Sequence, residues 1–502
     1  MRLARFALLL LACVAFGAGA GPGQQAIQTL ADRARSLAPE FAADALLRIV
    51  ESNAVMDKDL RKELIENAFR QAAAAQQQVA RVAVTAAGEA AWAGRAANLG
   101  LDVTSLQSRA VRDMLSLDAK KARELFGEIV PPRLERLSCD APLVFDVSSY
   151  YEALAGVAQK AFSPKEIADE EPLKLLTRFA GNLQGPAQVA PVARMLTAVR
   201  LDAEQLATLV TAFAGALKNL TGDPRSFMAA VRQSGESSHI AALARLCTKM
   251  GIDNHALLES YRAYLVAHLH GTRCEERPGT PGSISFGLTS SVTGAPVVPV
   301  QNPAEVFNAE LRPLASPGAA PNPIGADEAS PTGIEPSKSA AAECSSSGCR
   351  ELIDRYRKLL FGPGGMPYSN EQKNSNEWRA QLTDYLGALA AWREDSEEDG
   401  PGGFARKCQL FSSLIYLAPN GPDREQVLRA FVAFLGSSNY QREHRAEWLV
   451  PVSSLIGRVF ADPLGLTEIR KELLAAENPA ISLYANLEAL APRSPDRFLA
   501  LM

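Results

Sequence analysis

The sequence contains few of the residue types that form most functional sites. Aromatic residues form 7% of its 502 residues, and only five residues are histidines. Its cysteines include no Cys-x-x-Cys pair, which is the spacing that structural zinc sites prefer. His268 and His270 lie two positions apart, so on a helix they point to different sides. We therefore predict no metal-binding, cofactor-binding or catalytic residues.

Strong charge of one sign is also missing. The chain has 52 Lys and Arg against 56 Asp and Glu, which gives a formal net charge of -4. No run of basic residues stands without acidic residues among them, whereas nucleic-acid-binding proteins usually carry a basic stripe. Beyond the first 20 residues, Gly, Pro or a charged residue interrupts every apolar run. We therefore expect neither a nucleic-acid partner nor a transmembrane segment.

What the chain does contain is typical of helices. Alanine and leucine dominate, and hydrophobic residues reach 47%. Asp118, Asp202 and Asp253 each follow an apolar residue and precede a helical pattern, as helix N-caps do. These starts do not recur at a fixed period, which excludes a regular repeat array. Residues 72–97 are rich in Ala and Gln and also favour helix. We predict an all-α fold made of irregular helical hairpins, similar to an α-solenoid.

A Pro-, Gly- and Ser-rich stretch at residues 275–343 divides the helical patterns. Proline disfavours helix at the preceding residue, so we interpret this stretch as a largely disordered linker. It separates an N-terminal helical block, residues 21–274, from a C-terminal helical block, residues 344–502. Within the linker we predict a short helix at 303–311 that docks through Phe307. Flexibility is expected mainly at 275–300 and 315–342, and no convincing strand-like run is longer than the one at 295–300.

Residues 1–20 have the features of a signal peptide. Arg2 and Arg5 precede an apolar run at 6–16, and small residues end the segment at Ala20. We expect cleavage after Ala20 and export to the periplasm or the cell exterior. Leu10-Leu11-Ala12-Cys13 resembles the lipobox of bacterial lipoproteins, so a lipid anchor at Cys13 is the alternative.

Six cysteines remain after the signal peptide, an even number that favours disulfides in an exported protein. Cys139 lies in a predicted loop and Cys274 lies just past a helix end, so we predict that they pair. Cys344 and Cys349 are predicted to close a small loop where the second block begins, and Cys349–Cys408 is the competing pair. Cys247 and Cys408 lie on apolar helix faces and are the candidates for buried free thiols.

Two short motifs resemble parts of known functional sites. The acidic run at 395–399 resembles the opening of an EF-hand loop, but Arg406 stands where that loop needs a glutamate. Glu259-Ser260 resembles the Glu-Ser pair of lytic transglycosylases, which are exported enzymes with helical superstructures. We expect an exported, non-enzymatic helical scaffold or binding protein of the cell envelope, with a protein or peptide partner. The alternative is an envelope glycan hydrolase or lyase.

Overall fold

Helices dominate the computed structural model of the chain, and the prediction of an all-α fold is confirmed. The predicted signal peptide with Cys13, the strand-like run at 295–300, Cys344 and the acidic run at 395–399 lie outside the described residues. No helix in the described part of the chain is long and apolar enough to cross a membrane. The described residues are 22–52, 54–83, 94–139, 141, 143–233, 235–275, 302–316, 318, 320–329, 333–336, 347–362, 365–392, 401–462 and 466–490.

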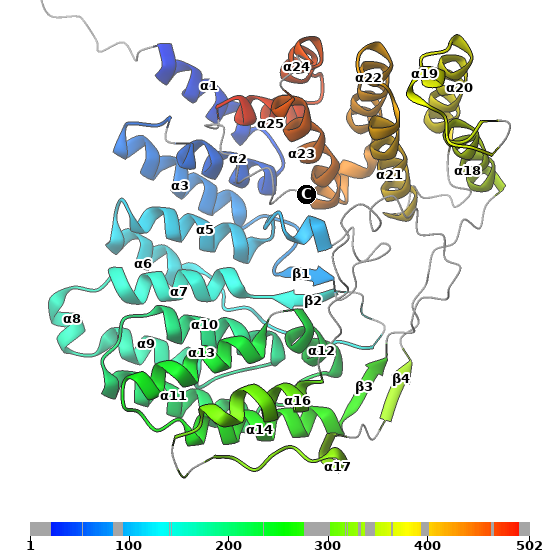
Figure 1. The fold of residues 1–502 in the computed structure, drawn as a ribbon. Coiled ribbons are helices and arrows are strands. Elements are labelled where there is room, and N and C mark those ends of the chain that lie inside the picture. Colours follow the sequence, from blue (N-terminus) through cyan, green and yellow to red (C-terminus); the bar gives the residue numbers. More distant parts are fainter. Residues whose placement is uncertain are drawn as a thin grey trace, which may run out of the picture.

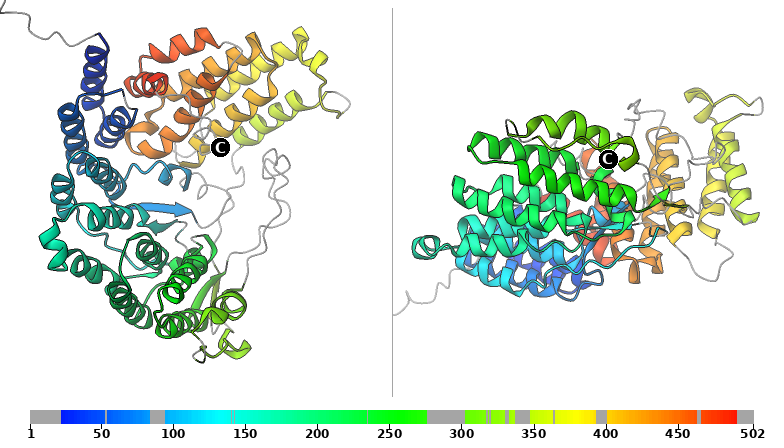
Figure 2. Two further views of the ribbon diagram at one scale, coloured as in Figure 1. Left: turned by 60° about the vertical axis from the view of Figure 1, so that its left-hand side comes forward. Right: turned by 90° about the horizontal axis from the view of Figure 1, so that it is seen from below.

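The helices that precede the linker stack on one another, largely in chain order (Figure 1). Figure 2 shows that this stack forms an arc. The stack consists of α1 (Pro22–Arg35), α2 (Pro39–Glu51), α3 (Lys58–Ala72), α5 (Val103–Leu115), α6 (Ala119–Glu128), α7 (Ser148–Lys160), α8 (Pro164–Ala168), α9 (Glu171–Ala180), a 3-10 turn (Pro186–Gln188), α10 (Val189–Ala198), α11 (Ala203–Lys218), α12 (Pro224–Gln233), α13 (Glu236–Lys249) and α14 (His255–His270).

Aspartate caps start several of these helices where the sequence predicts them. Asp118 Oδ1 accepts a hydrogen bond from Lys121 N at 3.1 Å. Asp202 Oδ1 accepts from Gln205 N at 2.9 Å, and the Gln205 side chain completes a capping box. Asp253 is offset by one residue, because Asn254 is the N-cap of α14 while Asp253 accepts from His255 N at 3.0 Å. Local capping chemistry therefore sets these boundaries.

Two pairs of short strands interrupt the helices. β1 (Ala80–Ala83) pairs antiparallel with β2 (Leu143–Asp146), and β3 (Thr272–Glu275) pairs parallel with β4 (Gly333–Pro336). The expectation of helix across 72–97 is therefore wrong at β1. Backbone pairing with β2, far along the chain, overrides the helix propensity of these residues. A stacked side chain supports the pairing, because the Arg81 guanidinium lies 4.9 Å from the Phe145 ring centroid.

The middle of the predicted linker is ordered against α13 and α14. α16 (Pro303–Val306) continues into a π-helical turn (Phe307–Leu311) and a 3-10 turn (Arg312–Leu314). Phe307 and Leu311 are fully buried, so this segment is docked through its apolar side. The π-turn is an unusual geometry, and both large side chains belong to the buried apolar cluster.

Residues 320–329, within the range 315–342 where flexibility is expected, lie against α14. Arg262 of α14 forms an ion pair with Glu328 of α17 (Ala326–Ala329) at 2.6 Å. Its Nε also donates to the Asn322 carbonyl at 2.8 Å. The Arg262 guanidinium also donates to the Pro323 carbonyl at 3.3 Å, so a single side chain of α14 satisfies two backbone acceptors of this proline-rich segment.

The C-terminal helices run back so that the last one, α25, packs on α1 and α2 (Figures 1 and 2). The two described ends of the chain therefore lie side by side. This set consists of α18 (Ser347–Leu360), α19 (Asn370–Lys373), α20 (Asn376–Ala391), α21 (Pro401–Leu417), α22 (Pro422–Ser437), a 3-10 turn (Asn439–Arg442), α23 (Arg445–Ala461), α24 (Thr467–Leu474) and α25 (Pro479–Leu490).

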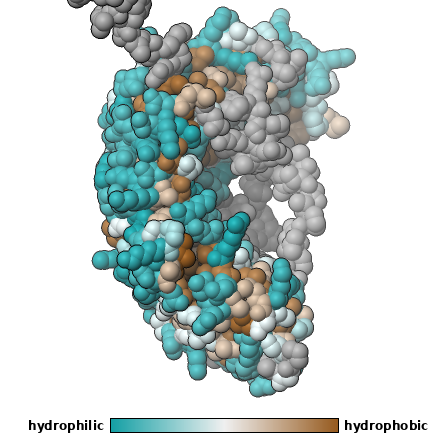
Figure 3. Space-filling view, turned by 90° about the vertical axis from the view of Figure 1, so that its left-hand side faces the viewer, coloured by the Kyte–Doolittle hydropathy of each residue, from teal (hydrophilic) through white to brown (hydrophobic). Residues whose placement is uncertain are grey.

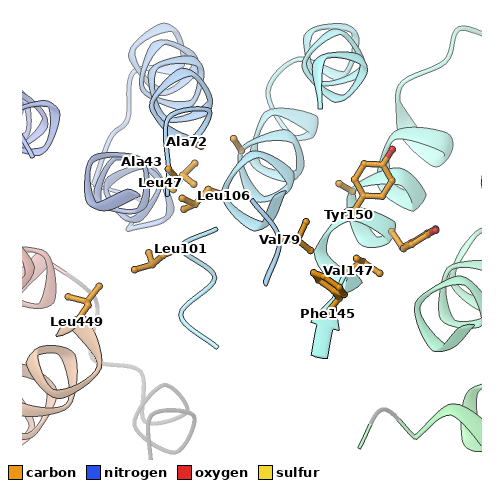
Figure 4. Close-up of a cluster of buried hydrophobic side chains, with 14 of the residues drawn as sticks. Ala43, Leu47, Ala72, Val79, Leu101, Leu106, Phe145, Val147, Tyr150 and Leu449 are labelled. Carbon is orange, nitrogen blue, oxygen red and sulfur yellow. The ribbon is translucent and has the colours of Figure 1, made fainter. Parts of the chain in front are cut away.

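One buried apolar cluster extends through both sets of helices. Figure 4 shows Leu449 of α23 in the same cluster as Leu47 of α2 and Leu101. At the junction the Phe41 ring lies 5.9 Å from Trp448 and 6.0 Å from Tyr484, measured between ring centroids. The N-terminal and C-terminal helices are therefore joined by packing as well as by the covalent linker.

Candidate functional site

The predicted Cys139–Cys274 disulfide is present. The two Cα atoms are 5.2 Å apart, and the bond closes a loop across 135 residues. It ties the connection between α6 and β2 to strand β3, which follows α14 directly. The end of the first stack is therefore linked covalently to its middle.

Cys349 is also disulfide-bonded, and it is buried. Cys408 is free, so the competing Cys349–Cys408 pair is wrong. Cys408 is buried on the same apolar face of α21 as Phe404 and Phe411. The other candidate, Cys344, lies outside the described residues.

Among the described cysteines, Cys247 and Cys408 are free, and both are buried. Burial raises the pKa of Cys247 to about 11. Burial also raises the pKa of Cys408, although the charges of Lys407 and Arg95 oppose that shift. Since the thiolate is the reactive form, neither thiol acts as a nucleophile near neutral pH.

An apolar groove lies between α1, the connection from α2 to α3, and the C-terminal end of α25. Its volume is about 830 Å³. Figure 3 shows apolar surface near this end of the molecule, and further apolar surface down the middle and over the lower part of the same face. The groove is lined by Ala26, Ile27, Thr29, Leu30, Arg33, Ala54, Val55, Met56, Asp57, Leu60, Asn486, Ala489 and Leu490.

The sequence of α1 explains one wall of the groove. Ile27, Leu30, Ala31 and Ala34 recur at helical spacing and are buried against the neighbouring helices. Arg33 lies beside this stripe and is exposed. The wall is thus apolar at its base and charged at its rim.

The second wall depends on the N-cap of α3. Asp57 Oδ1 accepts hydrogen bonds from Asp59 N at 2.8 Å and Leu60 N at 3.1 Å. This cap fixes the preceding connection so that Val55 is buried while Met56 is 90% exposed. Leu490 of α25, on the third wall, is 38% exposed. Such exposed apolar side chains around one groove are typical of a binding surface.

A buried charge network holds α25 in place beside the groove. Asp44 of α2 is fully buried and forms ion pairs with Arg48 at 2.8 Å and Arg109 at 2.7 Å. Burial alone would raise the Asp44 pKa, but the charges of Arg48 and Arg109 outweigh it and lower the pKa. Tyr484 of α25 donates to the same carboxylate. This network therefore holds α25 against α2.

A second polar cluster lies inside the first stack. Glu236 is fully buried and accepts hydrogen bonds from Tyr261 Oη at 3.0 Å and Tyr264 Oη at 3.3 Å. Burial raises the Glu236 pKa to about 8, against the opposing effect of these two hydrogen bonds. Because all three side chains are buried, this carboxyl has no access to a substrate.

Glu259, the acid of the transglycosylase-like pair, does not join that cluster. It lies on α14 and is half-buried, and its Oε2 has no hydrogen-bond partner. Tyr261, two positions later, points to a different side of the helix and is buried. The structure therefore does not bring Glu259 and Glu236 together as a catalytic pair.

The groove was not predicted, because its walls come from opposite ends of the sequence. The sequence offers only Met56 directly before the N-cap Asp57, a position where apolar residues normally pack inward. The structure instead leaves Met56 90% exposed. Among the described residues, no group of three or more His, Cys, Asp or Glu side chains is arranged to hold a metal ion. No family model, curated protein or solved structure matches this chain.

Proposed function

We propose that this protein is an exported, non-enzymatic binding protein of the cell envelope. Its irregular, α-solenoid-like helical hairpins would present the apolar groove to a segment of a partner protein or peptide. The observation that carries this proposal is the groove itself, with apolar walls, a charged rim at Arg33 and Asp57, and Met56 90% exposed. Export is supported by the Cys139–Cys274 disulfide, since such bonds persist in oxidising compartments.

The composition of the groove suits an amphipathic helix or an extended apolar segment. A helix-in-groove complex needs a few apolar anchors and a polar border. Burying one exposed methionine side chain contributes about 1.5–3 kcal/mol. Met56 and Leu490, on opposite walls, would both be covered by one such segment.

The alternative is an envelope glycan hydrolase or lyase. Glycosidases generally use two carboxyl groups about 5–9.5 Å apart on either side of the scissile bond. Asp57 supplies the single carboxylate in the groove lining, and it caps α3. The fully buried Glu236 has no open face. These features favour binding over glycan cleavage.

The test is affinity capture from envelope extracts with the wild-type chain and Met56→Asp. A charge at Met56 should weaken recovery of a groove-dependent partner at least about tenfold, since a lost apolar anchor costs more than 1.4 kcal/mol. Met366→Asp is the matched control, because Met366 is 73% exposed and lies outside the groove lining. Equal recovery of every partner by wild type and Met56→Asp would contradict the proposal.

A further inference from the structure

We propose that the outer face of α13 and α14 is a peptide-binding surface, and that residues 302–316 and 320–329 are its ligand within the chain. We refer to these residues as the docked segment. They contact α13 and α14, the last two helices of the first stack, at the end opposite α1 (Figure 1). This surface is separate from the groove, so the inference goes beyond the function proposed above.

The docked segment touches the stack along one edge. A stack of helical hairpins leaves an apolar face at its end, where no further hairpin follows. The residues of the docked segment that are buried against this face are Ala304, Phe307, Leu311, Pro321 and Ile324. On its other side, Glu305 and Glu310 are exposed. The segment is therefore held on one side, as a bound peptide is, and is not enclosed by neighbouring helices.

Two apolar anchors come from one turn of the docked segment. Phe307 and Leu311 are fully buried and lie four positions apart. The Phe307 ring lies 6.5 Å from the Tyr261 ring of α14, measured between centroids. Apolar anchors at positions i and i+4 are typical of amphipathic segments that bind in grooves between helices.

Asn254, which begins α14, binds the backbone of the docked segment. Its Nδ2 donates to the Leu314 carbonyl at 2.8 Å, and its Oδ1 accepts from the Ser316 amide at 3.0 Å. The same Nδ2 donates to the Ala244 carbonyl at 3.2 Å, which fixes the amide on α13. An N-cap asparagine normally caps its own helix, but this side chain makes no such bond. A buried side-chain amide is thus used to hold another segment by its backbone.

Arg262 of α14 makes a second contact of this kind. Within the described residues, every hydrogen bond of its guanidinium goes to the docked segment. It donates to the Asn322 carbonyl at 2.8 Å, to the Pro323 carbonyl at 3.3 Å and to the Glu328 carboxylate. The backbone bonds do not depend on side-chain identity, whereas the charge pair requires an acid at one position.

These contacts define the chemistry of the partner. The surface fits a peptide that has two apolar anchors four positions apart, then an extended stretch held by its backbone, then an acidic residue. Because the docked segment carries this pattern within the same chain, a partner with the same pattern must displace it.

The test is binding of a fluorescein-labelled synthetic peptide of residues 302–329 to the full chain, measured by fluorescence anisotropy. Phe307→Ala/Leu311→Ala weakens the docked segment as a competitor, so this double variant should bind the peptide at least about tenfold more tightly than wild type. A peptide that carries the same two alanines should bind the double variant at least about tenfold more weakly than the native peptide. Circular dichroism checks that the helices of the double variant are folded.

A charge reversal tests the Arg262 contact without changing the buried anchors. The Arg262→Glu chain should bind a Glu328→Arg peptide about fivefold more tightly than the native peptide, and wild type should show the opposite order. Both peptides meet the same competing segment in each chain, so their ratio reports the charge pair. This comparison decides the question even if the double variant does not fold.

Three results would overturn the inference. The first is a folded double variant that binds the native and alanine peptides equally or binds neither, which would make the docked segment an integral layer of the fold. The second is equal affinity of the Arg262→Glu chain for the two charge forms of the peptide. The third is loss of peptide binding when Met56→Asp is added to the double variant, which would place the peptide in the groove. Partner capture that depends on Met56 concerns only the proposed function, which stands or fails separately.

Discussion

The hydroxyl of Tyr484 donates a 2.8 Å hydrogen bond to Oδ2 of Asp44, across 440 positions of sequence. This contact joins α25 to α2 at the junction between the C-terminal and N-terminal helices. A second ionic contact lies nearby, where Arg445 pairs with Glu40 at 2.7 Å. The junction therefore combines buried charge with the aromatic packing around Phe41.

Tyr484→Phe should lower the free energy of unfolding by about 2 kcal/mol, because it removes a buried hydrogen bond to a charged acceptor. Asp44 would keep its ion pairs with Arg48 and Arg109. Urea denaturation measures the change. Tyr416→Phe is the control, since Tyr416 is 69% exposed and should change stability by less than about 0.5 kcal/mol. If both substitutions lowered the free energy of unfolding equally, the Tyr484–Asp44 hydrogen bond would not stabilise the junction.

Glu236→Gln should remove the part of the pH dependence of the free energy of unfolding that comes from ionisation of Glu236. The folded-state pKa of Glu236 is raised to about 8, above the usual value of 4.5, because the carboxyl is buried. Its stabilising neutral form is fully present below pH 4.5, and stability is lost as the pH rises from there toward 8. The slope within this window is on the order of 1 kcal/mol per pH unit. The amide of glutamine keeps the partners Tyr261 and Tyr264 without ionising.

Thermal unfolding between pH 5 and pH 9 tests this expectation. Wild type should lose stability with rising pH more steeply than Glu236→Gln, and the variant should be the more stable chain at pH 8. Glu204→Gln is the control, because Glu204 is exposed on α11. Parallel pH profiles for wild type and Glu236→Gln would show that the buried carboxyl is not the source of the dependence.

Cys139→Ser/Cys274→Ser should lower the free energy of unfolding by up to about 5 kcal/mol, because a bond that closes a long loop restricts the unfolded chain. Guanidinium denaturation measures the loss. Reduction of wild type should reproduce it and add the contribution of the Cys349 disulfide. Reduction of the double variant should therefore report the Cys349 bond alone. A double variant as stable as wild type would refute the expected role of the Cys139–Cys274 bond.

Phe307→Ala should release the docked segment of the linker. The substitution removes a fully buried ring and costs about 3–5 kcal/mol locally. Limited proteolysis should then cut faster within 302–329, while α1 and α2 remain intact. Val306→Ala is the comparison, since Val306 is only partly buried against the core. Cleavage that begins inside α2 or α5 would instead indicate that Phe307 supports the whole fold.

Several features could be predicted because their causes are local. Helix starts at Asp118 and Asp202 follow from one side chain and the amides of the next turn. The Cys139–Cys274 pair followed from predicted positions in a loop and at a helix end, combined with burial patterns for Cys247 and Cys408. Strand β1 was missed, because its pairing with β2 is a long-range contact that composition does not encode.

By itself, the sequence determined the all-α class and the capped helix starts, since helical spacing and capping act over a few residues. Only the tertiary structure decided that α25 returns to α1 and α2, that residues 320–329 dock on α14, and that Met56 and Leu490 line one groove. Each of these depends on surfaces from distant parts of the chain packing together. Their complementarity is a property of the folded shape, so no local pattern in the sequence reveals it.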